Sequence, residues 1–291
     1  MTMVKNPPSS QSSSRESHDS GLRKDVRFLT TLLGDVIREQ EGEKLFSKIE
    51  QIRLLAKNIR QNSDPKMIAE QKKLIESLDL DEAYKIARAF TIYFQLVNIA
   101  EETQRVRRIR EYERQASEPQ DMSLRKLFSD LKRNGLTAAE LAKFLSNMRI
   151  ELVLTAHPTE AKRRTVMDHL LRIAAQLSQL DRPDLTIYEH DLAVDRVKET
   201  LEILWQTSEI RSRRVEVKDE VDQTLFFFQR TILNLLPDMH ERLGREFTRC
   251  FGEKGHEIQP FVHFGSWVGS DRDGNPNVTC DVTKRDRKSV V

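Results

Sequence analysis

The chain has 291 residues, enough for one large domain or two smaller ones. Lysine and arginine total 48 against 46 for aspartate and glutamate, so the net charge is only +2. A balanced charge argues against binding to nucleic acid or to an anionic membrane. No apolar run is long enough to cross a membrane, and residues 1–20 lack the apolar core of a signal peptide. We therefore expect a cytoplasmic protein with neither kind of partner.

Residues 1–21 are rich in serine and proline, which predicts a disordered tail. Residues 22–150 show helical periodicity and predict an N-terminal helical region. One apolar stripe consists of Leu45, Ile49, Ile52, Leu55 and Ile59. Asp79 is placed to cap a long helix, whose expected apolar stripe is Ile86, Phe90, Tyr93, Val97 and Ala100.

The helical rhythm breaks at Glu151–Thr155, a short β-compatible run that predicts the first strand. Thr159 then caps a predicted helix, and further helices follow through Trp205 and across 225–236. Phe261–Phe264 is the second predicted strand. A mostly α chain with an α/β part, beginning near residue 151, is therefore expected.

A histidine follows the first predicted strand, and it can carry chemistry. His157 is held by a proline just before a helix start, where free N–H groups favour an anion, and Arg163 and Arg164 come shortly after it. Histidine titrates near neutrality, so the segment offers a base or a proton donor beside a phosphate-sized site. The alternative is a buried, hydrogen-bonded His157 with both arginines on a solvated helix face.

Charged residues are also concentrated in the turn that follows the second predicted strand, Ser270–Pro276. A calcium loop is excluded there, because Pro276 occupies the position of the required glycine and Val282 that of the bidentate glutamate. The functional interpretation is that Arg272 points into a site, with a neighbouring aspartate fixing its rotamer. The alternative is a surface turn whose charges satisfy one another.

A third cluster, Arg211, Arg213 and Arg214, either binds an anion or complements a helix dipole. The remaining candidate histidines lie in no ligand pattern and are interpreted as structural or surface residues; they are His169, His190, His240, His256 and His263. The two cysteines form neither a disulfide framework nor a zinc pattern, so no metal site is predicted within this chain.

Two of these segments resemble the signatures of the phosphoenolpyruvate carboxylase family. Glu151–Thr159 with the arginine pair after it is similar to the family's histidine signature, and Phe264–Thr279 is similar to the second signature. Leu32–Gly42 and Leu204–Arg211 also resemble the family, so the likeness covers almost all of the chain from Leu22 to Thr283. Ser270 departs from the family's usual glycine at that position.

The resemblance implies an N-terminal helical bundle leading, over 151–291, into the first strands of an incomplete TIM-type (β/α)8 barrel. It implies a homo-tetrameric enzyme that carboxylates phosphoenolpyruvate with bicarbonate to give oxaloacetate and phosphate, a reaction that feeds the tricarboxylic acid cycle. His157 becomes the catalytic histidine, Arg272 a substrate-binding residue and Arg164 a weaker candidate for the same role. Mg²⁺ or Mn²⁺ is the implied cofactor, with ligands beyond residue 291.

The family continues after Thr283 into an apolar helix, where this chain has the charged run Lys284–Val291. We therefore expect a truncated chain that is inactive by itself. The alternative is a non-catalytic helical module, derived from the family, that senses anions or binds a subunit.

Overall fold

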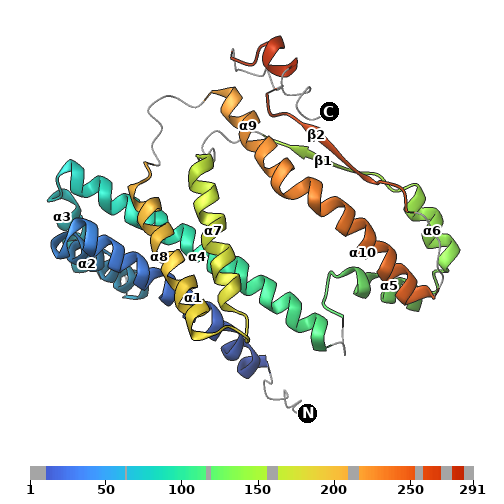
Figure 1. Cartoon of the computed structure of the whole chain (residues 1–291), viewed down its shortest axis with the longest axis horizontal. Coiled ribbons are helices and arrows are strands. Elements are labelled where there is room, and N and C mark those ends of the chain that lie inside the picture. Colours follow the sequence, from blue (N-terminus) through green and yellow to red (C-terminus); the bar gives the residue numbers. More distant parts are fainter. Residues whose placement is uncertain are drawn as a thin grey trace, which may run out of the picture. The chain divides into compact units, whose positions relative to one another are not determined.

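The computed structural model describes residues 11–62, 64–115, 119–155, 163–208, 216–252, 258–269 and 277–284. Helices dominate this part of the chain, which also contains two short strands (Figure 1). In chain order the elements are α1 (Gln11–Glu41), α2 (Glu43–Asn62), α3 (Pro65–Glu76), α4 (Leu80–Gln115), α5 (Leu124–Arg133), α6 (Ala138–Ser146), β1 (Ile150–Leu154), α7 (Arg164–Leu180), α8 (Ile187–Gln206), α9 (Val217–Phe227), the π-helical segment η2 (Phe228–Ile232), α10 (Leu233–Phe251) and β2 (Val262–Ser266).

Two compact units make up the chain. Unit 1 contains Met1–Ile109 and Thr165–Ser208, and unit 2 contains Arg110–Arg164 and Glu209–Val291. This grouping by packing differs from the predicted boundary at residue 150, because α7 and α8 pack with the N-terminal helices. The division into a tail, a helical region and the start of a barrel remains a prediction about the domains of a longer protein.

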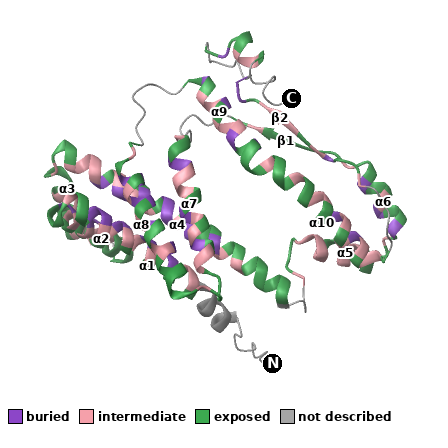
Figure 2. Cartoon of the chain, in the orientation of Figure 1, coloured by how far each residue is buried: buried purple, intermediate pink, exposed green. Residues whose placement is uncertain are grey.

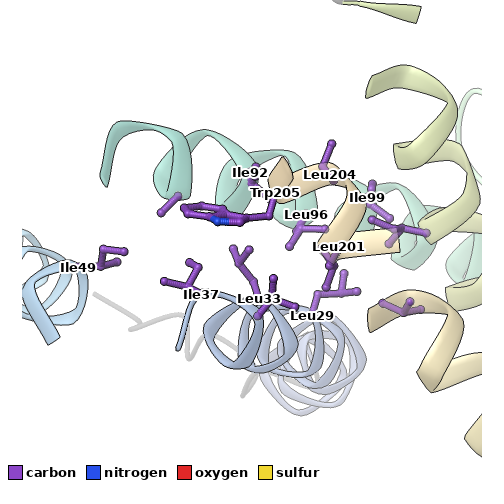
Figure 3. Close-up of a cluster of buried hydrophobic side chains, with 14 of the residues drawn as sticks. Leu29, Leu33, Ile37, Ile49, Ile92, Leu96, Ile99, Leu201, Leu204 and Trp205 are labelled. Carbon is purple, nitrogen blue, oxygen red and sulfur yellow. The ribbon is translucent and has the colours of Figure 1, made fainter. Parts of the chain in front are cut away.

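Unit 1 is a helical bundle built around α1. Gly42 has a φ of 85°, a conformation that glycine adopts without strain, and it allows α2 to follow α1 after a single-residue turn. Figure 3 shows side chains from α1, α2, α4 and α8 meeting in one cluster. Its fully buried members include Leu29, Ile92, Leu96, Leu201 and Leu204. The core of unit 1 therefore joins the N-terminal helices to α8, which lies far from them in the sequence.

The start of α1 differs from the expected end of the tail. The helix begins at Gln11, within the polar segment predicted to be disordered, and residues 1–10 lie outside the described part of the chain. Propagation of an existing helix adds one hydrogen bond for each residue fixed, so a helix formed around the apolar residues after Leu22 can continue into a polar sequence.

The predicted cap of α4 is confirmed, because the backbone N–H of Glu82 donates to Asp79 Oδ1 at 2.8 Å. The predicted apolar stripe of the same helix was partly wrong. Phe90, Tyr93 and Val97 are only partly buried, whereas Ile92 and Leu96 are fully buried. A stripe with the expected period therefore exists, but its centre is shifted around the helix.

Unit 2 has a separate core between α5, α6 and α10. Phe128 of α5 and Phe247 of α10 are almost completely buried, and their rings meet edge to face with centroids 6.3 Å apart. Leu141 and Leu145 of α6 and Phe261, just before β2, complete the contact. This core holds the chain just before each of the two strands.

β1 and β2 form a parallel sheet, with Ile150 opposite Val262 and Leu154 opposite Ser266. Both lie close to their predicted positions, and the mostly α fold with an α/β part is confirmed. Ile150, Leu152 and Val153 are between 42% and 50% exposed, so β1 appears largely in the exposed colour in Figure 2. No further strand lies beside this pair among the residues that the structure describes.

Candidate functional site

The sheet brings the two signature segments to one edge. β1 and β2 are parallel, so the chain leaves both strands at the same carboxyl edge. The segment with His157 follows β1 there, and the segment with Arg272 follows β2. In parallel α/β proteins ligands bind at this edge and in the loops that follow it. Leu154 and Ser266, which are distant in the sequence, are therefore paired at this edge.

Hydrogen bonds continue the pairing beyond the last residues of the strands. The backbone N–H of Trp267 donates to the carbonyl oxygen of Leu154 at 2.8 Å, and that of Val268 donates to Ser266 Oγ at 3.1 Å. The Val268 side chain is 1% exposed. The backbone at the start of both loops is thus held by paired and buried groups.

The chain on either side of Ser270–Pro276 is tied together. Gly269 precedes this segment with a φ of 69°, a left-handed conformation that favours glycine. Thr283, after the segment, donates its hydroxyl to the carbonyl oxygen of Gly269 at 3.0 Å. Val278 on the returning chain is buried. Gly269, which precedes the segment, and Thr283, which follows it, are therefore held together.

His157 and Arg272 themselves lie outside the described residues, as do Thr159 and the cluster Arg211, Arg213 and Arg214. Their predicted roles remain predictions. Of the three site residues that the resemblance implies, only Arg164 is described. It is the first residue of α7 and its side chain is exposed.

Arg164 lies beside an aromatic side chain that the sequence patterns did not single out. Its guanidinium carbon is 5.4 Å from the centroid of the Phe226 ring, and that of Arg230 is 5.8 Å from the same ring. Arginine can retain hydrogen-bonding capacity at its edge while its flat face contacts an aromatic ring. The ring therefore brings together two cations that lie far apart in the sequence.

The aromatic residues also connect this region to the sheet. Phe228 in η2 meets Phe264 of β2 edge to face, with ring centroids 4.9 Å apart. The run Phe226–Phe228 was the available sequence signal, because three consecutive aromatic residues cannot all face one side of a regular α-helix. Arg230 lies within the π-helical turn, an irregularity that often occurs at functional sites.

The end of α8 is held by a side chain from α4. Arg88 Nη2 donates to the carbonyl oxygen of Thr207 at 2.6 Å and to that of Leu204 at 3.3 Å. Its guanidinium carbon lies 5.3 Å from the centroid of the Trp205 ring, and Trp205 Nε1 donates to Glu41 at 3.1 Å. Arg88 thereby satisfies carbonyl groups at the helix end that precedes the predicted arginine cluster.

Three of the other histidines have local roles. In His169 burial lowers the pKa, and Arg172 lowers it further. His240 Nδ1 is 2.9 Å from the carbonyl oxygen of Leu236, and its ring lies 4.8 Å from that of Phe261. His190 is 3.4 Å from its neighbour Asp191. These contacts agree with their interpretation as structural or surface residues.

The described residues contain no group of three or more histidine, cysteine, aspartate or glutamate side chains that could hold a metal ion. The described residues therefore do not fit a divalent cation. Among the described helices, none is long and apolar enough to cross a membrane.

The described part of the chain is mostly α-helical and carries a small parallel sheet of two strands. The family model described as phosphoenolpyruvate carboxylase matches residues 22–289. The chain belongs to the phosphoenolpyruvate carboxylase family.

Curated relatives agree with this assignment. The chain is 35% identical over 268 residues to a phosphoenolpyruvate carboxylase of Rhodopseudomonas palustris, and the match covers 91% of this chain and 29% of that protein. For relatives of the same description from Ralstonia nicotianae and Nitrosomonas europaea the identity is 36%, over 96% and 90% of this chain. The chain spans about 29% of the length of these relatives.

Proposed function

We propose that this chain supplies the N-terminal part of a phosphoenolpyruvate carboxylase, which converts phosphoenolpyruvate and bicarbonate into oxaloacetate and phosphate. The observation that carries the proposal is the parallel pairing of β1 with β2, because it sends both signature segments from one edge of the sheet. The reaction class follows from the names of these relatives.

In this proposal β1 and β2 are the first strands of a (β/α)8 barrel. An eight-unit barrel typically needs about 250 residues, whereas only 141 remain from Glu151 to Val291. The exposed apolar side chains of β1 would be covered by units contributed by the rest of the longer protein.

His157 is proposed to act as a general base. The reaction first transfers the phosphoryl group to bicarbonate, which leaves the enolate of pyruvate and carboxyphosphate. A histidine that accepts the carboxyl proton of carboxyphosphate helps it to break into carbon dioxide and phosphate. The enolate carbon then attacks carbon dioxide, and the new carbon–carbon bond completes oxaloacetate. The segment's position after β1 supports this role.

Arg272 is proposed to bind phosphate or enolate oxygens, which gain negative charge as the reaction proceeds. A fixed arginine in a closed site stabilises such charge without reorganisation of solvent. The hydrogen bond from Thr283 to Gly269 supports this role, because it joins the chain before the segment to the chain after it. Arg164, steadied by Phe226, is proposed as a weaker contributor to anion binding.

The longer protein would use Mg²⁺ or Mn²⁺, which neutralises developing charge when bound. Its ligands are proposed to lie beyond residue 291. We further propose a homo-tetramer in the cytoplasm, and we propose that the 291-residue chain alone has no carboxylase activity, because the barrel would not be closed.

A second candidate function is a non-catalytic module that senses anions or binds a subunit. The contact of Arg164 and Arg230 with one aromatic ring favours it, because this pair needs no completed barrel. If the longer protein binds anions but does not carboxylate phosphoenolpyruvate, that result would favour this second function.

The test is a coupled oxaloacetate assay with magnesium and bicarbonate on the longer protein, its His157→Asn variant and the 291-residue chain. The expected result is turnover in the longer protein, loss of carboxylation with retained phosphoenolpyruvate binding in His157→Asn, and no turnover in the short chain. Near-normal turnover of His157→Asn would remove the proposed base. Turnover by the short chain that depends on His157 would show that the barrel is dispensable.

A further inference from the structure

A groove of about 700 Å³ lies in unit 1, between α1, α2 and α4. α1 contributes residues from Leu22 to Arg38, α2 those from Phe46 to Arg53, and α4 contributes Ala89, Phe90 and Tyr93. This volume falls within the range of roughly 300–1,000 Å³ typical of small-molecule sites. None of the residues in the proposed carboxylase mechanism lines this groove.

The inner part of the groove is apolar and rigidly supported. Leu33, Ile37, Ile49 and Ala89 line it, and each is at most 7% exposed because it also belongs to the core of unit 1. Figure 3 shows Leu33 and Ile37 on α1, with Ile49 on α2. An apolar ligand body placed here would contact side chains whose positions are already determined by the core packing.

Gly34 allows the Phe46 ring to lie close to α1 beside this apolar lining. A Cβ atom at Gly34 would lie 3.1 Å from Phe46 Cε2, closer than almost all real contacts of this type. The absence of a side chain at position 34 lets the Phe46 ring approach α1. Phe46 is also covered by Arg38, whose guanidinium carbon lies 3.8 Å from the ring centroid.

The rim of the groove is cationic. Its lining includes the arginines Arg23, Arg27, Arg38 and Arg53 but only two carboxylates, Asp35 and Glu50. Arg38 pairs with Asp35 at 2.8 Å, and Arg53 donates two hydrogen bonds to Glu50 at 2.9 and 2.7 Å. The positive charge of these two arginines is therefore already matched within the groove.

Arg27 differs from these two residues. Its side chain is exposed, lines the groove and forms no salt bridge with any residue in the described part of the chain. A guanidinium group can donate two parallel hydrogen bonds to a carboxylate, sulfonate or phosphate. Arg27 is thus available to bind an acidic group at the edge of an apolar cavity.

We propose that this groove binds a small amphipathic anion, whose apolar body lies against Leu33, Ile37 and Ile49 and whose acidic group pairs with Arg27. Because the rim is cationic, the groove favours an anion over a cation or a neutral molecule. Because the lining is apolar, it favours an anion with an apolar body over inorganic phosphate. The site is separate from the proposed carboxylase function and does not depend on it.

The test uses two fluorescent probes with the same aromatic rings. 8-Anilinonaphthalene-1-sulfonate carries one negative charge, and N-phenyl-1-naphthylamine carries none. Each is titrated into the whole chain labelled with ¹³C at isoleucine methyl groups. We expect shifts at Ile37 and Ile49, which line the groove, and none at Ile173, which is buried in the same core away from the lining. Methyl shifts locate the probe even where it also binds other apolar surfaces.

The charge is tested with Arg27→Glu against Lys24→Glu, a matched reversal at an exposed residue of α1 that does not line the groove. Arg27→Glu should lower the affinity for the sulfonate probe, measured from the shifts of these methyl groups, by about tenfold or more. The affinity for the neutral probe should change by less than about threefold. Lys24→Glu should change neither probe by more than about twofold. Equal effects of the two reversals on the sulfonate probe would overturn the pairing with Arg27.

A groove-filling variant gives an independent measurement. Thr31 is an exposed lining residue of α1, so Thr31→Trp should occupy part of the cavity without replacing a core side chain. With unchanged helical circular dichroism, it should abolish the shifts of Ile37 and Ile49 with both probes. Undiminished shifts in this variant, or their absence in the unmodified chain, would overturn the site.

Discussion

Arg107 of α4 donates two hydrogen bonds to Asp181, from Nε at 2.7 Å and from Nη2 at 2.6 Å. Its remaining terminal nitrogen, Nη1, donates to Asp25 of α1, whose side chain is only 9% exposed. One guanidinium group therefore connects α1, α4 and the turn after α7, and neutralises a buried carboxylate.

We predict that Arg107→Ala lowers the free energy of unfolding by about 2–3 kcal/mol, because Asp25 would remain buried without its cation. Urea denaturation followed by circular dichroism measures the loss. Asp181→Asn is the control, and it should cost less than about 1 kcal/mol because this partner is more exposed. A larger loss for Asp181→Asn than for Arg107→Ala would contradict the importance of the buried Asp25.

Arg88 should stabilise the end of α8. We expect Arg88→Met to cost about 1–2 kcal/mol, because methionine keeps an apolar stem but leaves the carbonyl groups of Leu204 and Thr207 without this donor. Amide hydrogen exchange should accelerate in the last turn of α8 and stay unchanged in α5. Uniform acceleration across both helices would indicate global destabilisation instead of loss of a helix cap.

The edge-to-face pair Phe128–Phe247 should hold unit 2 together. Phe247→Ala is expected to destabilise unit 2 by about 3–5 kcal/mol, and Phe247→Leu by about 1–1.5 kcal/mol, because leucine fills more of the cavity. Faster amide exchange in α5 and α10, with α1 and α2 unchanged, is the predicted pattern. Similar losses for both variants would argue against tight packing at this position.

Glu50 should contribute a pH-dependent stability. Its hydrogen bond with Arg53 lowers the pKa of the Glu50 carboxyl below its ordinary value of 4.5. A lowered pKa in the folded chain gives stability that is present above pH 4.5 and is lost as the pH falls through the folded value. Both side chains are more than one third exposed, so solvent screening limits the contribution to about 0.5 kcal/mol.

The measurement compares Glu50→Gln with the unmodified chain in urea at neutral pH and near pH 3. The variant should be less stable at neutral pH, and the difference should disappear in acid. Glu70→Gln, at an exposed carboxylate of α3, serves as the control and should have little effect at either pH. A difference that persists unchanged in acid would assign the effect to packing.

The Arg272→Lys variant tests whether Arg272, in the second signature, binds phosphate or enolate oxygens through two parallel hydrogen bonds. In the longer protein we expect a loss of about tenfold or more in kcat/KM despite the retained charge, because an ammonium group does not reproduce two parallel hydrogen bonds. Steady-state kinetics with varied phosphoenolpyruvate measures it, with Lys284→Ala as the control outside the signature. Unchanged kinetics would favour a surface turn whose charges satisfy one another.

Local sequence determined much of the secondary structure. Asp79 predicted the start of α4 because a cap needs only a side-chain oxygen within reach of nearby N–H groups. The β-compatible runs before His157 and before the glycine-rich loop predicted β1 and β2 close to where they lie. The signature segments at their ends, and with them the family, could also be recognised from the sequence alone.

Tertiary structure decided which of these local elements meet. Only the parallel pairing of β1 with β2 places the two signature segments at a common edge, since no local pattern specifies a partner so distant in the chain. Burial of Ile92 and Leu96 in place of Phe90 depends likewise on the helices packed around α4. Periodicity identifies an apolar face because it reflects the turn of one helix, but the centre of that face is set by contacts with other segments.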